Sequence, residues 1–341
     1  MSLNIKPITD KPTWEQVVKT FPEANFLSSW NWGAFHASLG KQVFYLGIYQ
    51  DNQPQGLALL VKETAKRGNY LTIAGSPLLD WSQPKIFTTL TQALTDLSRR
   101  EHCLFVRVRP QILDTKENSD LFLHQGFRPS PMHLTADRTL QLNLKPSPQE
   151  ILAQMRKNTR YEINKAERLG LTVKTSTDPK DIKEFHRHQL ILAQKHGFVP
   201  FSYDFLHHQF QIFARDHQAL LFHSYYQNTL LASAFIIFYG PEAVYHYGIS
   251  TRDNQKLPGS YAALWAAIQE AKNRNLDRFN FWGIAPEGHI HHRFWGVTVF
   301  KKGFGGEEVA YLPAHDLPTS PLYPLTRAFE SFRAKKRNLA S

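Results

Sequence analysis

Cysteine is almost absent from this sequence, since Cys103 is the only one in 341 residues and no internal disulfide can form. Long apolar runs are missing too: no stretch of about 18 apolar residues occurs, which argues against a membrane-spanning helix. The start, "MSLNIKPITDKPTWEQ", lacks the apolar core of a secretory signal. We therefore expect a cytoplasmic protein in a reducing compartment.

Negative charge is in short supply, because 40 Lys and Arg stand against 29 Asp and Glu, a net charge of +11. Such a surplus attracts nucleic acid, phosphorylated ligands or an anionic membrane, although it could also serve solubility alone. The 42% hydrophobic residues are ample for packed cores, and the length predicts about two domains.

Two segments of the chain follow the same pattern. "VFYLGIYQDNQPQGLALLVKETAKRGNYLTIAGSP" at 43–77 and "ALLFHSYYQNTLLASAFIIFYGPEAVYHYGIST" at 219–251 each predict three strands. Their first turns fall at Asp51-Asn52 and Gln227-Asn228. A predicted helix follows each segment, at 84–101 and 260–274, and then another strand.

The match continues to a Gly-Phe turn in each half, in "FLHQGFRP" and "VFKKGFGG". This order of elements is typical of an acyl-coenzyme A N-acetyltransferase (GNAT) fold. We predict an α/β protein with two duplicated GNAT-like domains at 1–146 and 147–317. The last helix, within 318–341, is amphipathic and places Leu325, Phe329 and Phe332 on its apolar face.

A basic helix is predicted between the two halves, ending at Gly170. Its segment "MRKNTRYEINKAERLG" carries Arg156, Lys157 and Arg160, with Tyr161 beside them. Clustered cations next to an aromatic ring suit phosphate contacts and stacking on a base. An ordinary solvated helix would give the same pattern, so the segment alone does not choose between the two.

This segment resembles the Fem family, the peptidyltransferases that use aminoacyl-tRNA to build peptidoglycan cross-bridges. The resemblance continues through "YHYGIS", "LPGSYAALWAAIQEAKNRNLDRFNFWGIAP" and "FWGVTVFKKGFGGEEVAYLPAHDLP", and more loosely through "SSWNWGAFHASLG". It implies two GNAT-like domains, with the C-terminal helix packing back on the first. The short interval after Gly170 implies the compact form, which lacks the helical hairpin of some members.

The implied reaction moves an amino acid from aminoacyl-tRNA to the stem peptide of a nucleotide-linked or lipid-linked peptidoglycan precursor. It implies no cofactor beyond the tRNA co-substrate, and the histidine clusters show no metal-ligand spacing. Peripheral contact with the inner face of the membrane is a further expectation. The implied site residues fall into three groups: Lys301 and Phe300 at the reacting ester; Arg156, Lys157, Arg160, Lys302 and Arg293 on tRNA or phosphate; Trp32, His36, Tyr247 and Lys195 on the precursor.

Lys301 and Lys302 are expected on a short strand, which would turn them to opposite faces so that only one reaches the site. Gly303, Gly305 and Gly306 could bring backbone close to a ligand or merely form a turn. The sequence departs from the family pattern at three places: His36 replaces a lysine, Phe201 an arginine, and Asn280 an aspartate. These departures leave the precursor open.

Three other functions remain open. An acetyl-coenzyme A-dependent acyltransferase would need a glycine-rich turn at a helix start, where "QKLPGSYAALW" has Pro258 instead. A non-catalytic RNA-binding protein could keep the fold and its basic groove. A related amino-acid or peptide ligase acting outside the cell wall is the third.

Overall fold

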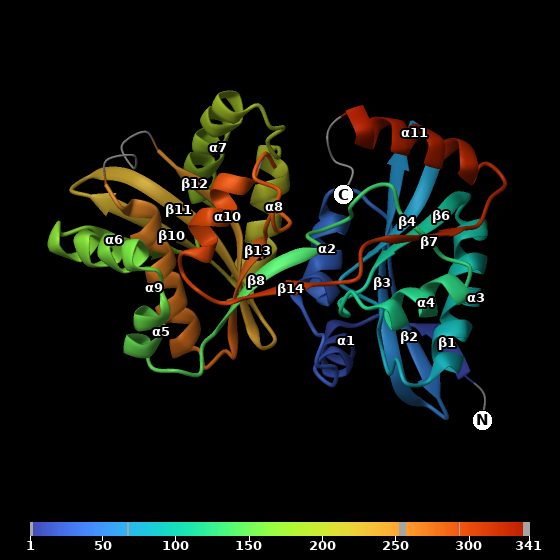
Figure 1. Ribbon diagram of the computed structural model, residues 1–341. Helices are drawn as coiled ribbons and strands as arrows, with labels where there is room; N and C mark the ends of the chain where they lie inside the picture. Colours follow the sequence, from blue (N-terminus) through green and yellow to red (C-terminus); the bar gives the residue numbers. More distant parts are fainter. Residues whose placement is uncertain (1–2, 67, 252–256, 293, 337–341) are drawn as a thin grey trace. The chain divides into compact units, whose positions relative to one another are not determined.

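The chain folds into two units, each built around one mixed β-sheet. The computed structural model describes residues 3–66, 68–251, 257–292 and 294–336 (Figure 1). Unit 1 comprises residues 1–137 and 310–341, and unit 2 comprises residues 138–309. No helix in these described ranges is both long and apolar enough to cross a membrane.

Unit 1 has an eight-stranded sheet in the order β1-β2-β3-β4-β6-β15-β7, with β5 paired to β3. Its strands are β1 (Leu3–Pro7), β2 (Val43–Gln50), β3 (Gln53–Ala65), β4 (Gly68–Ala74), β5 (Leu78–Leu79), β6 (Cys103–Arg109), β7 (Arg128–Pro129) and β15 (His315–Pro318). Its helices are α1 (Lys11–Val18), η1 (Phe26–Ser28), α2 (Trp30–Ser38), α3 (Pro84–Arg100), α4 (Lys116–His124) and α11 (Tyr323–Lys336).

Unit 2 has a seven-stranded sheet in the order β14-β8-β13-β12-β11-β10-β9. Its strands are β8 (Arg138–Asn143), β9 (Thr172–Ser176), β10 (Ala219–Tyr226), β11 (Thr229–Tyr239), β12 (Glu242–Ser250), β13 (Arg278–Gly283) and β14 (Glu307–Ala310). Its helices are α5 (Pro148–Gln154), α6 (Lys157–Arg168), η2 (Pro179–Asp181), α7 (Ile182–His196), α8 (Tyr203–Arg215), α9 (Gly259–Asn273) and α10 (Trp295–Lys302).

The two sheets correspond position by position, as the duplication predicted. Each has five strands of its own half, then one strand from the other half, then a seventh strand of its own. The sixth position of unit 1 is β15, and that of unit 2 is β8. The sequence suggested boundaries after residues 146 and 317, but the units divide after Asp137 and Val309. The reason is that β8 pairs with β13 in the sheet of unit 2, and β15 pairs with β6 in the sheet of unit 1.

Strand alternation builds the two layers of unit 1. On β3, Ala58 and Leu60 belong to a core with the buried residues of α3 and α4. The alternate residues Leu59 and Val61 are also buried and point to the opposite face. The turn from β2 to β3 has positive φ at Asp51 and Asn52, the geometry that twisted hairpins favour.

The segment with the paired lysines is a helix, so the predicted strand is wrong. In α10, the buried residues Thr298 and Lys301 recur three apart, and Phe300 packs against the core that contains Phe304. This period of three to four belongs to a helix, not to the alternation of a strand. It also makes α10 the counterpart of α4, since both helices precede a Gly-Phe pair.

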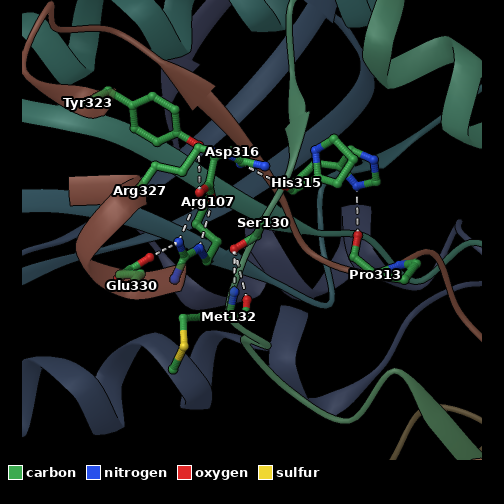
Figure 2. Close-up of polar contacts among 10 residues, drawn as sticks. Arg107, Ser130, Met132, Pro313, His315, Asp316, Tyr323, Arg327 and Glu330 are labelled. Carbon is green, nitrogen blue, oxygen red and sulfur yellow. Dashed lines mark hydrogen bonds and ion pairs between the residues drawn. The ribbon is translucent and has the colours of Figure 1, made fainter. Parts of the chain in front are cut away.

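Helix α11 packs on unit 1 through a buried polar cluster, as the family resemblance implied (Figure 2). Arg107 on β6 pairs with Asp316 on β15 at 2.7 Å and with Glu330 on α11 at 2.6 Å, and all three side chains are buried. Tyr323 donates its hydroxyl to the Asp316 carboxylate at 3.0 Å (Figure 2). Polar and ionic contacts thus hold the inner face of this helix.

Candidate active site around Lys301

Lys301 is a buried lysine whose amine is hydrogen-bonded to a main-chain carbonyl. Its side chain lies in the last turn of α10 at 7% exposure, and Nζ donates to the Gly283 carbonyl at 2.6 Å. Nζ also lies 5.8 Å from the ring centroid of Tyr245. Across the described part of the chain no carboxylate forms an ion pair with it. Burial lowers the pKa of Lys301 to about 7, so both protonation states are accessible near neutral pH.

The Gly283 carbonyl that receives Lys301 is placed by a strained end of β13. Trp282 has a φ of 63°, a left-handed backbone conformation that is rare outside glycine and concentrates at functional sites. Its N–H donates to Asn280 Oδ1 at 2.9 Å, and Asn280 Nδ2 donates to the fully buried Glu242 at 3.2 Å. An aspartate in place of Asn280 would set a second carboxylate against Glu242, so the asparagine suits this chain.

Arg156 and Arg160, both predicted to contact phosphate, bind different parts of unit 2. Arg156 occupies the N-cap position of α6, and its side chain donates to the Val299 carbonyl of α10 at 3.2 Å, which brings it to the helix that carries Lys301. Arg160 instead donates to the carbonyls of Ala153 and Met155 at the end of α5.

The remaining cations differ in their contacts. Lys302 forms an ion pair with Glu308, and Lys157 is exposed. Arg293 lies outside the described residues.

Phe300 and the glycines after it serve packing within unit 2. Phe300 packs edge-to-face against Tyr261 and Phe304, with ring centroids 5.0 and 5.4 Å apart. At Gly306 φ is +94°, and a Cβ there would lie 2.5 Å from the Gln141 carbonyl oxygen. A Cβ at Gly303 would meet the Thr159 hydroxyl at 2.4 Å. The turn and the close packing therefore account for glycine at these two positions.

Trp32 and His36 line a pocket in unit 1. The pocket has a volume of about 160 Å³, and its walls are completed by residues of β3 and β4, Glu63 and Thr72 among them, together with Leu134 and Thr135. His36 Nδ1 and Thr135 Oγ1 are buried and have no hydrogen-bond partner among the described residues. Glu63 is already paired with Lys41 at 2.7 Å. The pocket therefore offers two neutral polar atoms, on His36 and Thr135, beside a carboxylate that is already paired.

Burial, and to a lesser extent the charge of Lys41, lowers the pKa of His36 to about 3. Its imidazole is therefore neutral at pH 7 and cannot replace the positive charge of the lysine expected there.

We predict that the His36 ring signals stay unshifted between pH 5 and 8 in an NMR titration, assigned with His36→Gln. Because the unfolded chain takes up this proton near pH 6.5, native stability should also rise with pH from about 3 to about 6.5. A His36 midpoint between pH 6 and 7 would contradict this assignment.

Tyr247 and Lys195 belong to unit 2. Tyr247 on β12 packs against Phe201 and His246, with ring centroids 5.0 and 3.9 Å apart, and burial raises its pKa. Lys195 is exposed in the last turn of α7. Phe201 thus packs among aromatic rings where the family pattern suggests arginine.

The sequence signals did not single out Tyr245, Trp282 or Glu242, which lie around Lys301 and the end of β13. Only the Trp-Gly pair at the end of a buried strand hinted at these residues.

Comparisons with known proteins identify the relatives of this chain. The profile of the FemAB family matches residues 9–124 and 207–331. Aminoacyltransferase FemA of Staphylococcus aureus is 32% identical over 108 residues, which is 31% of this chain and 26% of that protein. The matched stretch thus spans about a quarter of its curated relative.

Two solved structures share the fold. The crystal structure of FemX matches with a TM-score of 0.85 at 16% identity, over 96% of this chain and 100% of that one. A tandem GNAT protein from the clavulanic acid biosynthesis pathway matches with a TM-score of 0.60 at 10% identity, over 94% and 99% of the two chains. The predicted fold of duplicated GNAT-like domains is confirmed.

Proposed function

The chain belongs to the FemAB family, and from this premise we propose that it transfers an amino acid from aminoacyl-tRNA to the stem peptide of a peptidoglycan precursor. The relative FemA is named an aminoacyltransferase. The observation that carries the proposal is buried Lys301, which has no carboxylate partner in the described structure and lies beside a strained strand end.

The chemistry is aminolysis of an ester. An amine of the stem peptide attacks the aminoacyl carbonyl, a new C–N bond forms, and the C–O bond to the terminal ribose breaks. The proton lost by the amine passes to the ribose oxygen that leaves. Negative charge develops on the carbonyl oxygen in between, and a cation in a water-poor site stabilises it far more than in water. Protonated Lys301 would supply that cation.

Proton uptake would accompany binding of an anionic ligand at Lys301. A nearby negative charge favours the protonated amine and raises its pKa above the value of about 7 set by burial. Affinity should therefore fall as pH rises from 7 to 9. Arg156, held against α10, would extend the positive charge toward the tRNA backbone. The proposal needs no cofactor other than aminoacyl-tRNA.

The helix starts favour this proposal over an acyl-coenzyme A-dependent acyltransferase. Pro258 is the N-cap of α9, the Gly259 N–H after it already donates to the Leu257 carbonyl at 2.9 Å, and α3 begins at Pro84. A pyrophosphate site of the GNAT type relies on free backbone N–H groups at a glycine-rich helix start, and proline has none.

The test is a transfer assay with the full chain. A pool of radiolabelled aminoacyl-tRNA is incubated with nucleotide-linked and with lipid-linked muropeptide precursors, and the product is identified by mass. We expect acceptor-dependent release of free tRNA and a precursor heavier by one amino acid. Salt-sensitive binding that treats charged and uncharged tRNA alike, without product, would instead favour a non-catalytic RNA-binding protein. A saturable thermal shift with acetyl-coenzyme A would favour the acyltransferase.

A further inference from the structure

Helix α11 carries its apolar residues on the face turned away from unit 1. The outward residues are Leu322 just before the helix and Leu325, Phe329 and Phe332 within it, exposed by 54%, 71%, 50% and 67%. The inward face holds Tyr323, Thr326, Glu330 and Ala334, all buried. A helix of a soluble domain ordinarily buries its apolar stripe and exposes its polar one, so α11 is inverted.

The predicted amphipathic helix is thus confirmed, but its apolar face does not pack on the first domain. The four outward side chains recur at spacings of three and four and form one continuous stripe along α11. Contiguous apolar patches of this kind mark interaction sites.

The charges on and after α11 indicate what kind of surface the apolar stripe would bind. Arg333 lies beside the stripe, with its guanidinium 5.8 Å from the ring centroid of Phe329, whereas Arg327 donates to the Pro129 carbonyl and the Tyr323 hydroxyl on the inward side. The sequence after Arg333 adds Lys335, Lys336 and Arg337. The single acid of α11 is Glu330, which is buried against Arg107 and presents no negative charge outward. With a net charge of +11 on the chain, a second copy would repel this face. An apolar stripe beside basic residues is complementary to an anionic lipid surface.

We propose that α11 docks the protein on an anionic membrane surface, with Leu322, Leu325, Phe329 and Phe332 inserted at the level of the headgroups. The buried cluster of Arg107, Asp316 and Glu330 anchors the helix to unit 1 by its polar side, which leaves the apolar side for lipid. The docking does not depend on the proposed transfer reaction and is measured without it.

The experiment is co-sedimentation of the full chain with vesicles of phosphatidylcholine alone or with about 30% phosphatidylglycerol, which gives the surface a negative potential. We expect binding to the anionic vesicles that weakens between about 0.1 and 0.5 M salt, and weak binding to the neutral ones. Leu325→Ser/Phe332→Ser should lower the partition coefficient on anionic vesicles at least tenfold. Arg333→Gln should lower it by about fivefold.

The matched control is Leu113→Ser/Leu123→Ser, which removes two exposed leucines from other parts of unit 1, at 55% and 45% exposure. This variant should bind vesicles as the parent does. All changed side chains except that of Arg333 are exposed, so circular dichroism and melting temperature should be unchanged.

Three outcomes would overturn the proposal. They are absence of binding to anionic vesicles at about 0.1 M salt, equal loss of binding in both double variants, and a dimer in solution that the α11 variant abolishes. The last would assign the stripe to a second copy of the chain.

Discussion

Lys301→Met is expected to lower the rate of aminoacyl transfer by at least about 100-fold while the protein remains folded. A single lost donor at a developing oxyanion has an effect of this order. Methionine fills a similar volume, so the packing of α10 is kept. The measurement is single-turnover transfer from labelled aminoacyl-tRNA, with circular dichroism to verify the fold.

The same variant is expected to be more stable than the parent at acidic and neutral pH. Lys301 has a pKa of about 7 in the folded protein, whereas an unfolded lysine titrates near 10.4. The unfolded chain therefore binds this proton more strongly, which destabilises the native state fully below pH ~7 and ceases to do so above pH ~10. Replacing the amine should raise the free energy of unfolding by a few kcal/mol at pH 6, with the gain fading toward pH 10.

Lys272→Met provides the matched control for both measurements. Lys272 on α9 also donates Nζ to a main-chain carbonyl, that of Leu144 at 2.9 Å, but its side chain is only half-buried. This variant should neither lose transfer activity nor gain stability with falling pH. If Lys301→Met kept full activity, the lysine would have no part in the reaction. If it melted well below the parent, its hydrogen bond to Gly283 would be structural.

The parts of the fold that depend on nearby residues could be predicted from the sequence. Helix α6 ends at Arg168, before the Gly170 that the sequence singled out, and the turn at Asp51-Asn52 follows from residues that tolerate positive φ. Helices α3 and α9 begin within one residue of their expected starts, because a proline stands at or just before each start.

The parts of the fold that depend on distant residues could not be predicted from the sequence. β8 and β15 each take the sixth position in the sheet formed mainly by the other half of the chain. This pairing joins residues far apart in the sequence, so no local pattern encodes it. The β-branched residues Val297, Thr298 and Val299 favour a strand, yet tertiary packing makes them part of α10. The burial of Lys301 follows from the packing of α10, and the outward apolar stripe of α11 follows from the pairing of Glu330 with Arg107 on a distant strand.

Arg107→Met is expected to lower the free energy of unfolding of unit 1 by about 3–5 kcal/mol, the usual effect of removing one partner from a buried ion pair. The guanidinium holds two buried carboxylates, Asp316 and Glu330, and without it both would lie uncompensated in a water-poor interior. Thermal and urea denaturation measure the loss.

Helix α11 should loosen at the same time, because the ion pair of Glu330 and the hydrogen bond of Tyr323 help to fasten its inward face, beside the ring contact of Tyr323 with Phe105. Trypsin should then cut at Arg327 and Arg333 faster than in the parent. Glu330→Gln is the control: the amide keeps the shape and a hydrogen-bond acceptor and buries no unpaired charge, so its loss should stay near 1–2 kcal/mol. Equal losses of unfolding free energy in the two variants would contradict a role for charge compensation at Arg107. The shape of the buried cluster would then be what holds the C-terminal helix.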